Sequence, residues 1–592
     1  MDRNQIDKKY KWGIDDIYSD SSLIKEDMDK ALSLIDEIIK YKDVELNENS
    51  LYEMISLEMS INRILEKLEA YVSLLCDEDT SNNKNQELKE EVTNLVNKFI
   101  SEAYFTDVKI LKLEYSTIKE FISLNSKLEE YEIYLENLFR FKKYTLSDKE
   151  ERIISSLSKA LGNNYDTYEL LKDSDMTFPL FKVDDKEYKL DNNLYSLYME
   201  SDNREVREKA FKTLYETYKS FKNVFANLII SNVKEEDSLS KIRGYNSSLE
   251  KSMYKDEVNV SVYNNLVDTV NANLDVLHKY YALKKKVLGL DELHLYDVYT
   301  DMIQNSEFRY SFDEALEIVT SALSILGEEY ISVLKKGIED RWIDVYPSRG
   351  KRTGGYSSGS YDTNPYILLN YQDKYDDMST LAHELGHSMH SYYTRNNNPY
   401  QYGYYSILVA EVASTVNELL LAKYVMNNTD DKNLKLFILN RILELFRATV
   451  YRQTMFSTFE KTIYEYVQDD KPLTADILGD IYYDLNKKYF GDDVVVDDEI
   501  RYEWERIPHF YYNFYVYKYA TGLSSACYIV NGLMDGTIKT SDYLEFLKCG
   551  KSKSPLDSLK VAGVDLTDES VISNGIKMFE STIKEFEEKY FN

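Results

Sequence analysis

Three of the chain's six histidines lie within eight residues, in the stretch "HELGHSMH" at 383–390. His383 and His387 are four positions apart, so a helix would place both imidazoles on one face. Two imidazoles with this spacing can bind one zinc ion, and the intervening Glu384 can take a proton from a water that the ion activates. The alternative is a helix with two unconnected histidines. The spacing favours a metal site with its own general base.

A catalytic zinc ion usually has three protein ligands and one position for water. His390, three residues after His387, is one candidate for the third ligand. However, three ligands on one helix face would lie along the helix axis rather than around the ion. A ligand from a second helix fits better, and Glu411 interrupts an apolar run within residues 405–425. Glu418, two turns later, shares its face and could orient a ligating histidine. The alternative for Glu411 is an ordinary ion pair.

These residues must be held by a helical framework, because the chain is poor in the residues that break helices. It contains 20 glycines and 7 prolines in 592 residues, and apolar residues recur at helical spacing from about residue 22 to 230. One stretch, 175–193, shows strand-like alternation and a proline. We therefore expect a mostly α protein with an N-terminal helical domain at 1–190 and a catalytic domain at 191–592.

The amino-acid composition changes in the segment that precedes the expected helix with His383 and His387. Residues 346–377 hold a glycine-rich loop and then "YILLNY", a run rich in strand-forming residues. We expect a short strand, followed by a helix that opens near Asp377, Ser379 or Thr380. The segment is either a connecting hairpin or an edge strand that pairs with an extended peptide. On the second interpretation, the substrate-binding candidates are Gly355, Tyr356, Tyr366 and Asn370.

Charge and cysteine content exclude several classes of protein. The formal net charge of -31 disfavours binding to nucleic acid or to an anionic membrane surface. Three widely spaced cysteines suit a reducing compartment better than a disulfide framework. The first residues lack the apolar core of a signal peptide, and no apolar run reaches membrane-spanning length. We expect a cytoplasmic protein without a membrane or nucleic-acid partner.

The motif "LAHELGHSMHSYY", followed by "EVASTVNELL" 24 residues after His387, resembles the oligoendopeptidase F branch of the thimet oligopeptidase-like zinc metallopeptidases. Further similar stretches are "YKWGIDDIYSD", "FRFKKYTLSDKEERIISSL", "GGYSSGSYDTNPYILLNY" and "ERIPHFYYNFYVYKYATG". The resemblance implies one zinc ion per chain, bound by His383, His387 and Glu411, with His390 outside the ligand set. It also implies a two-lobed fold around a deep substrate channel, with a small β-sheet beside the zinc helix.

The same resemblance gives roles to the aromatic stretch "PHFYYNFYVYKYATG". Peptide hydrolysis needs hydrogen-bond donors for the oxyanion that develops on the scissile carbonyl. The family places a histidine and tyrosines there, which implies His509 and Tyr517 here, with Tyr515 and Tyr512 as further candidates. For most of these rings the simpler interpretation is an aromatic face packed into the core.

The expected function is hydrolysis of internal bonds in short cytoplasmic peptides. One alternative is an exopeptidase of the dipeptidyl carboxypeptidase kind, although no motif identifies a group that would hold a free chain end. Another is a non-catalytic helical peptide-binding protein with a structural metal. Glu384 argues against the second, because a structural site needs no general base. The sequence does not indicate an oligomeric state.

Overall fold

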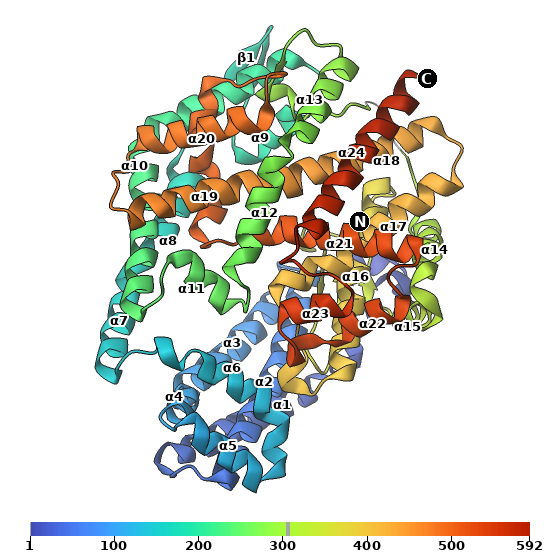
Figure 1. The fold of residues 1–592 in the computed structure, drawn as a ribbon. Coiled ribbons are helices and arrows are strands. Elements are labelled where there is room, and N and C mark those ends of the chain that lie inside the picture. Colours follow the sequence, from blue (N-terminus) through green and yellow to red (C-terminus); the bar gives the residue numbers. More distant parts are fainter. Residues whose placement is uncertain (1, 304–307) are drawn as a thin grey trace. The chain divides into compact units, whose positions relative to one another are not determined.

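The computed structural model describes residues 2–303 and 308–592, and the described chain is mostly helical (Figure 1). It divides into two compact units, each built from three separate stretches of sequence. The first unit comprises Met1–Lys143, Glu307–Asn427 and Ile529–Gly563. The second comprises Tyr144–Ser306, Asn428–Tyr528 and Val564–Asn592.

The first unit contains twelve α-helices among its described residues, several short 3-10 helices and a three-stranded sheet. Its helices are α1 (Ser21–Ile38), α2 (Glu48–Glu78), α3 (Asn83–Ala103), α4 (Phe105–Leu111), α5 (Tyr115–Leu124), α6 (Glu132–Arg140), α14 (Phe312–Ala322), α15 (Gly327–Glu339), α16 (Tyr375–Asn397), α17 (Ile407–Asn428), α22 (Thr540–Lys548) and α23 (Pro555–Val561).

Local sequence explains how the N-terminal helices begin and pack. Asn47 caps α2, because its side chain accepts hydrogen bonds from the backbone N–H groups of Asn49 and Ser50. The apolar faces of α1 to α6 then share one core, which includes Leu51, Leu68 and other fully buried residues. The amphipathic pattern of this region is therefore a set of packed helices, as expected.

The sheet of the first unit has the strand order β4–β6–β5, from β4 (Ile343–Asp344), β6 (Tyr366–Leu368) and β5 (Tyr356–Ser358). β6 pairs parallel with β4 and antiparallel with β5. The "YILLNY" strand is thus internal and forms a hairpin with β5, so of the two alternatives for this strand the edge position is wrong. The last part of the glycine-rich loop forms β5, which pairs with β6 and is an edge strand of the sheet.

The second unit holds the longest described helix, α10 (Arg204–Arg243), with α19 and α20 packed against it (Figure 1). Its helices are α7 (Asp148–Leu161), α8 (Asn163–Glu169), α9 (Asn192–Met199), α10, α11 (Ser248–Lys255), α12 (Val260–Ala272), α13 (Leu274–Leu288), α18 (Lys432–Phe446), α19 (Arg452–Gln468), α20 (Ala475–Phe490) and α24 (Glu569–Phe591). A further helix, α21 (Tyr517–Asp535), begins in the second unit and ends in the first.

Four short strands accompany these helices. β1 (Phe181–Val183) and β2 (Lys186–Tyr188) form an antiparallel hairpin where the sequence shows strand-like alternation. β3 (Leu293–His294) pairs parallel with β7 (Val494–Val495). The hairpin and residue 190 lie inside the second unit, and the division of the chain at that residue stays a prediction.

None of the helices in the described part of the chain is both long enough and apolar enough to span a membrane.

Candidate active site

Two helices of the first unit bring the predicted metal ligands together. α16 carries His383 and His387, and α17 carries Glu411. The two helices cross at Gly386, where an added Cβ would lie 2.5 Å from the Cα of Ser414. That distance is far below a normal contact, so the glycine between the two histidines lets α17 approach closely enough to present its glutamate.

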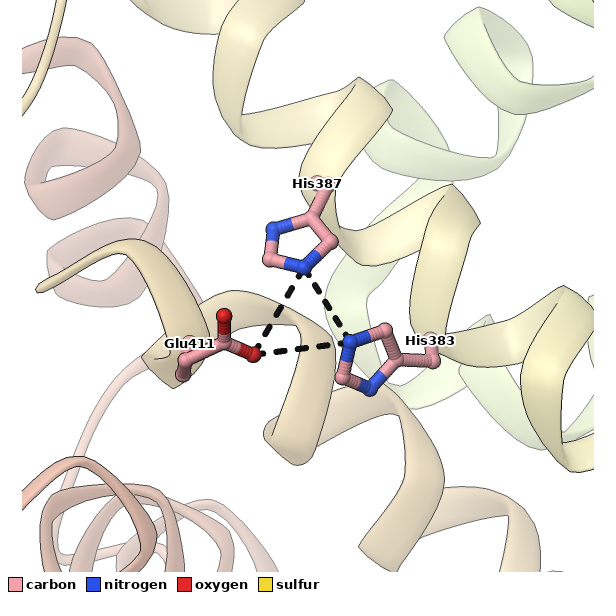
Figure 2. Close-up of side chains that lie close together, drawn as sticks. All are labelled: His383, His387 and Glu411. Atoms are coloured by element: carbon pink, nitrogen blue, oxygen red, sulfur yellow. Dashed lines mark hydrogen bonds and ion pairs between the residues drawn. The ribbon is translucent and has the colours of Figure 1, made fainter. Parts of the chain in front are cut away.

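The three side chains converge on one point (Figure 2). The Nε2 atoms of His383 and His387 are 3.1 Å apart. Glu411 Oε2 lies 3.5 Å from the first of these atoms and 3.6 Å from the second. Tetrahedral zinc, with bonds of about 2.0 to 2.2 Å, separates its ligand atoms by about 3.3 to 3.5 Å. The donor set and its spacing therefore fit a divalent ion such as zinc.

Both imidazoles are oriented by a second contact. His383 Nδ1 hydrogen-bonds to Glu418, one of the residues expected to support the ligands. His387 hydrogen-bonds to the backbone carbonyl of Ala410, next to the glutamate ligand. Such contacts fix the ring orientation and tautomer of a metal-binding histidine.

The pKa values of the two imidazoles are shifted in opposite directions. Burial lowers the pKa of His383, but the hydrogen bond to Glu418 and the neighbouring carboxylates outweigh it and raise the value to about 9. Burial and the nearby charge of His383 lower the pKa of His387 to about 3. The opposite shifts reflect the different surroundings of the two rings: His383 lies beside carboxylates, whereas His387 lies beside His383.

Glu384 lies beside the His-His-Glu cluster and is not part of it. Its side chain is buried, and it accepts a hydrogen bond from the backbone N–H of Ser357 in β5. Burial raises its pKa to about 7; the positive charge of His383 lowers the value, whereas the repulsion of Glu411 and Glu418 raises it further. A carboxyl with this pKa can both accept and return a proton near neutral pH.

His390 points away from this group. Its ring is almost fully buried and stacks on Tyr405, with ring centroids 3.7 Å apart and planes 4° from parallel. It also contacts the ring of Phe546 in α22. His390 is absent from the cluster that can hold a metal ion within the described residues, and its position is that of a packed core histidine.

The predicted substrate-binding residues of the sheet differ in exposure. Tyr366 is fully buried and donates its hydroxyl to the backbone oxygen of Gly13, at 3.1 Å. Tyr356 is half-buried and donates to Asp77. The side chain of Asn370 donates to the carbonyl oxygens of Arg352 and Gly354. Tyr366 and Asn370 therefore hold the sheet and its glycine-rich loop.

Gly355 is exposed and precedes the edge strand β5. An added Cβ at this position would lie 3.1 Å from the side chain of Thr380 in α16. This glycine keeps the loop close to α16, and its backbone stays open to solvent.

A second cluster of predicted residues lies in the second unit around His509. Its ring has Tyr512, Tyr515 and Tyr519 as neighbours, at centroid distances of 5.6, 6.3 and 6.1 Å. The Tyr519 hydroxyl is 3.5 Å from His509 Nε2. Tyr512 is exposed and shares a hydrogen bond with Tyr165. We call these four side chains the tyrosine cluster.

Tyr517 does not belong to the tyrosine cluster. It is fully buried against Tyr263, and its hydroxyl has no hydrogen-bond partner among the described residues. Tyr515 precedes α21 by two residues and Tyr519 lies in its first turn, with their ring centroids 5.5 Å apart, whereas Tyr517 between them in sequence is buried elsewhere. Tyr519 could have been found from the sequence, because it follows Tyr515 by four residues in the same aromatic stretch.

Comparison with known proteins agrees with the geometry. The family model "Peptidase family M3" matches residues 197–578, and the model "Oligopeptidase F" matches residues 109–178. Oligopeptidase PepF of Bacillus subtilis is 42% identical over 99% of this chain and 88% of its own length. Group B oligopeptidase PepB of Streptococcus agalactiae is 37% identical over 99% of this chain and 98% of its own length.

Solved structures are similar over nearly the whole chain. Oligoendopeptidase F from Enterococcus faecium has a TM-score of 0.75 and 31% identity, covering 96% of this chain and 99% of that one. A crystal structure from Chlamydophila abortus has a TM-score of 0.92 and 34% identity, covering 99% of both chains.

The fold and the His-His-Glu cluster define a mostly helical metallopeptidase. The chain belongs to peptidase family M3, in its oligoendopeptidase F branch. Its activity is that of a metalloendopeptidase.

Proposed function

We propose that the chain is a zinc-dependent endopeptidase that hydrolyses internal bonds of short peptides in the cytoplasm. The observation that carries this proposal is the convergence of His383, His387 and Glu411 beside the buried Glu384. The ligand set supports zinc, because two imidazoles and a carboxylate at these separations suit a tetrahedral site with one open position.

When bound, zinc would act as a Lewis acid that lowers the pKa of water and polarises a peptide carbonyl. Glu384 would take the proton from the attacking water and pass it to the leaving amine. Ser357 supports this role, since its N–H holds the carboxyl in place while leaving it free to change protonation state. Glu418 would keep the His383 ring in the ligating orientation.

The tyrosine cluster supplies donors for the oxyanion in this proposal. Burial lowers the pKa of His509, so its ring is neutral at physiological pH and can donate from one nitrogen. Tyr515 and Tyr519 are half-buried, and their rings lie side by side next to His509. Because Tyr517 is buried elsewhere, we assign the main tyrosine role to Tyr519, with Tyr515 beside it, instead of Tyr517.

Substrate binding would use the edge of the sheet beside the catalytic carboxyl. β5 is an edge strand, and an extended peptide can satisfy unpaired backbone groups of such a strand. Gly355 and Tyr356 are the residues of this edge that we propose to contact the peptide. A cytoplasmic location is supported by Cys76, Cys527 and Cys549, which are buried and form no disulfide within the described residues.

The test is hydrolysis of a quenched fluorescent peptide that is blocked at both ends. The purified protein should cleave it at an internal bond, lose this activity with a chelator, and recover it with zinc. Cleavage of the unblocked peptide alone, by removal of terminal residues, would establish an exopeptidase instead. Cleavage that a chelator does not affect would contradict the metal's role.

A further inference from the structure

The turn that leads from His509 to Tyr515 and Tyr519 has an unusual backbone. Asn513 has a φ of 51° and Phe514 a φ of 60°, so two consecutive residues other than glycine adopt the left-handed conformation. Side chains with a Cβ disfavour this region, and a bulky residue such as Phe disfavours it strongly. A turn of this kind persists only where the surrounding structure holds it.

Buried side chains from two neighbouring helices hold this turn. Glu460 Oε1, on α19, accepts a hydrogen bond of 2.6 Å from the backbone N–H of Phe514. One helical turn later, Tyr464 donates its hydroxyl to the Asn513 side chain at 2.7 Å. Ser252, on α11, donates to the backbone oxygen of Asn513 at 2.8 Å. The Phe514 ring packs on Tyr464, with centroids 4.6 Å apart.

The carboxyl of Glu460 has no other visible use. The residue is fully buried, and its second oxygen, Oε2, has no partner among the described residues. Burial raises its pKa to about 8. A buried carboxyl is expensive, and an apolar residue would fill the same space at lower cost. What an apolar residue lacks is an acceptor for the Phe514 N–H.

We infer that Glu460 is a positioning residue: its carboxyl oxygen holds the left-handed turn at Asn513 and Phe514, and so sets the tyrosine cluster in its reactive geometry. The inference rests on the proposed role of His509, Tyr515 and Tyr519 in catalysis. Because the turn separates His509 from the start of α21, its loss would rotate the two tyrosines relative to the imidazole.

The test compares Glu460→Met with Glu460→Gln. Methionine matches the length of the side chain and suits a buried site, but it cannot accept from the Phe514 N–H. Glutamine keeps the accepting oxygen. Glu460→Met should lower kcat about 10 to 100-fold with little change in KM, as small displacements of catalytic groups do, whereas Glu460→Gln should stay within about threefold of wild type.

Two further variants show whether the effect passes through the turn. Tyr464→Phe removes the hydrogen bond to the Asn513 side chain but keeps a ring against Phe514, and it should lower kcat in the same direction as Glu460→Met. Glu465→Met changes an exposed glutamate of the same helix and should leave kcat unchanged. Wild-type kcat in Glu460→Met, or equal losses in the Met and Gln variants, would overturn the inference.

A measurement independent of catalysis separates this inference from the proposed function. The ring resonances of His509, assigned by comparison with His509→Ala, should shift in Glu460→Met and stay in place in Glu460→Gln. If His509→Ala keeps full kcat, the proposed role of the tyrosine cluster fails, but the resonances still decide whether Glu460 holds the turn. An unshifted resonance in Glu460→Met would overturn the inference.

Discussion

Glu411 and His390 are both candidates for the third metal ligand, and their surroundings favour Glu411. Glu411 directs a carboxylate oxygen to within 3.6 Å of both imidazole Nε2 atoms. His390 is stacked between aromatic rings in the core. A ligand has to reach the ion from a direction that the two histidines leave open, and a second helix provides that direction.

We predict that Glu411→Ala weakens zinc binding by at least about 10 to 100-fold, the loss that even a supporting residue can cause. His390→Phe is the matched control, since phenylalanine can stack on Tyr405 without a ligating atom, and it should bind zinc as wild type does. Titration with a competing chelator measures both affinities. Loss of zinc in His390→Phe with retention in Glu411→Ala would reverse the choice of ligand.

At the scale of elements, the metal site depends on how closely α16 and α17 cross. Gly386 lies at the crossing, where an added Cβ would meet Ser414 Cα at 2.5 Å and the carbonyl oxygen of Ala413 at 2.7 Å. Helix propensity alone would favour alanine here by about 1 kcal/mol. The steric cost acts in the opposite direction and is larger, about 1 to 3 kcal/mol for overpacking.

Gly386→Ala should therefore lower the melting temperature and weaken zinc binding together. Gly575→Ala is its control, because Gly575 also lies in a helix but an added Cβ there has its nearest neighbour at 3.4 Å, an ordinary contact. Thermal unfolding followed by circular dichroism, with and without zinc, checks both variants. A higher melting temperature for Gly386→Ala than for the wild type would contradict close packing of α16 and α17 at this position.

The second prediction at the scale of elements concerns which tyrosines around the start of α21 face His509. Tyr515 and Tyr519 face His509, whereas Tyr517 is buried on another face of the same segment. Tyr519→Phe should lower kcat by about 10² to 10³-fold with a smaller effect on KM, as for other single oxyanion donors. Tyr517→Phe should change kcat little. The opposite result, measured by steady-state kinetics, would restore Tyr517 to the catalytic role.

Much of the site could be predicted from sequence because it follows from short-range spacing. His383, Glu384 and His387 lie within one turn of a helix, and Glu411 stands out in an apolar run. The start of α16 was less predictable: it begins at Tyr375, before the expected capping residues, and Asp377 accepts hydrogen bonds from the N–H groups of Gln372 and Lys374.

The remaining features depend on contacts between distant segments. The sheet order could not be predicted, because β4 is only two residues long and pairs with a strand more than twenty residues away. The turn at Asn513 and Phe514 has no glycine to signal positive φ. Glu460 resembles any glutamate of an amphipathic helix, and only the fold shows that it is buried.

At the scale of the whole molecule, both units are assembled from segments that alternate along the chain. The N-terminal helices contain no residues that we assign to the chemistry. We propose that they enclose the substrate, as the resemblance to oligoendopeptidase F implies, and so restrict access to short, unfolded chains. The substrate channel stays a prediction.

A restriction of this kind predicts a sharp dependence on substrate length. The protein should cleave peptides of about 6 to 18 residues, which can lie extended along a strand edge, and should leave casein and folded proteins intact. Mass spectrometry of a series of peptides of increasing length tests the first expectation, and gel electrophoresis of casein incubated with the protein tests the second. Rapid degradation of casein that a chelator abolishes would show that the helices do not restrict access.

The most direct test of the account is a paired measurement of bound zinc and peptide turnover in Glu384→Gln. Glutamine can still accept from the Ser357 N–H, so the site should keep its shape and bind zinc as wild type does. It cannot transfer the proton, so turnover of an end-blocked peptide should fall by at least about 10² to 10⁴-fold. Turnover near the wild-type rate with zinc bound would contradict the central claim that Glu384 is the general base of a zinc peptidase.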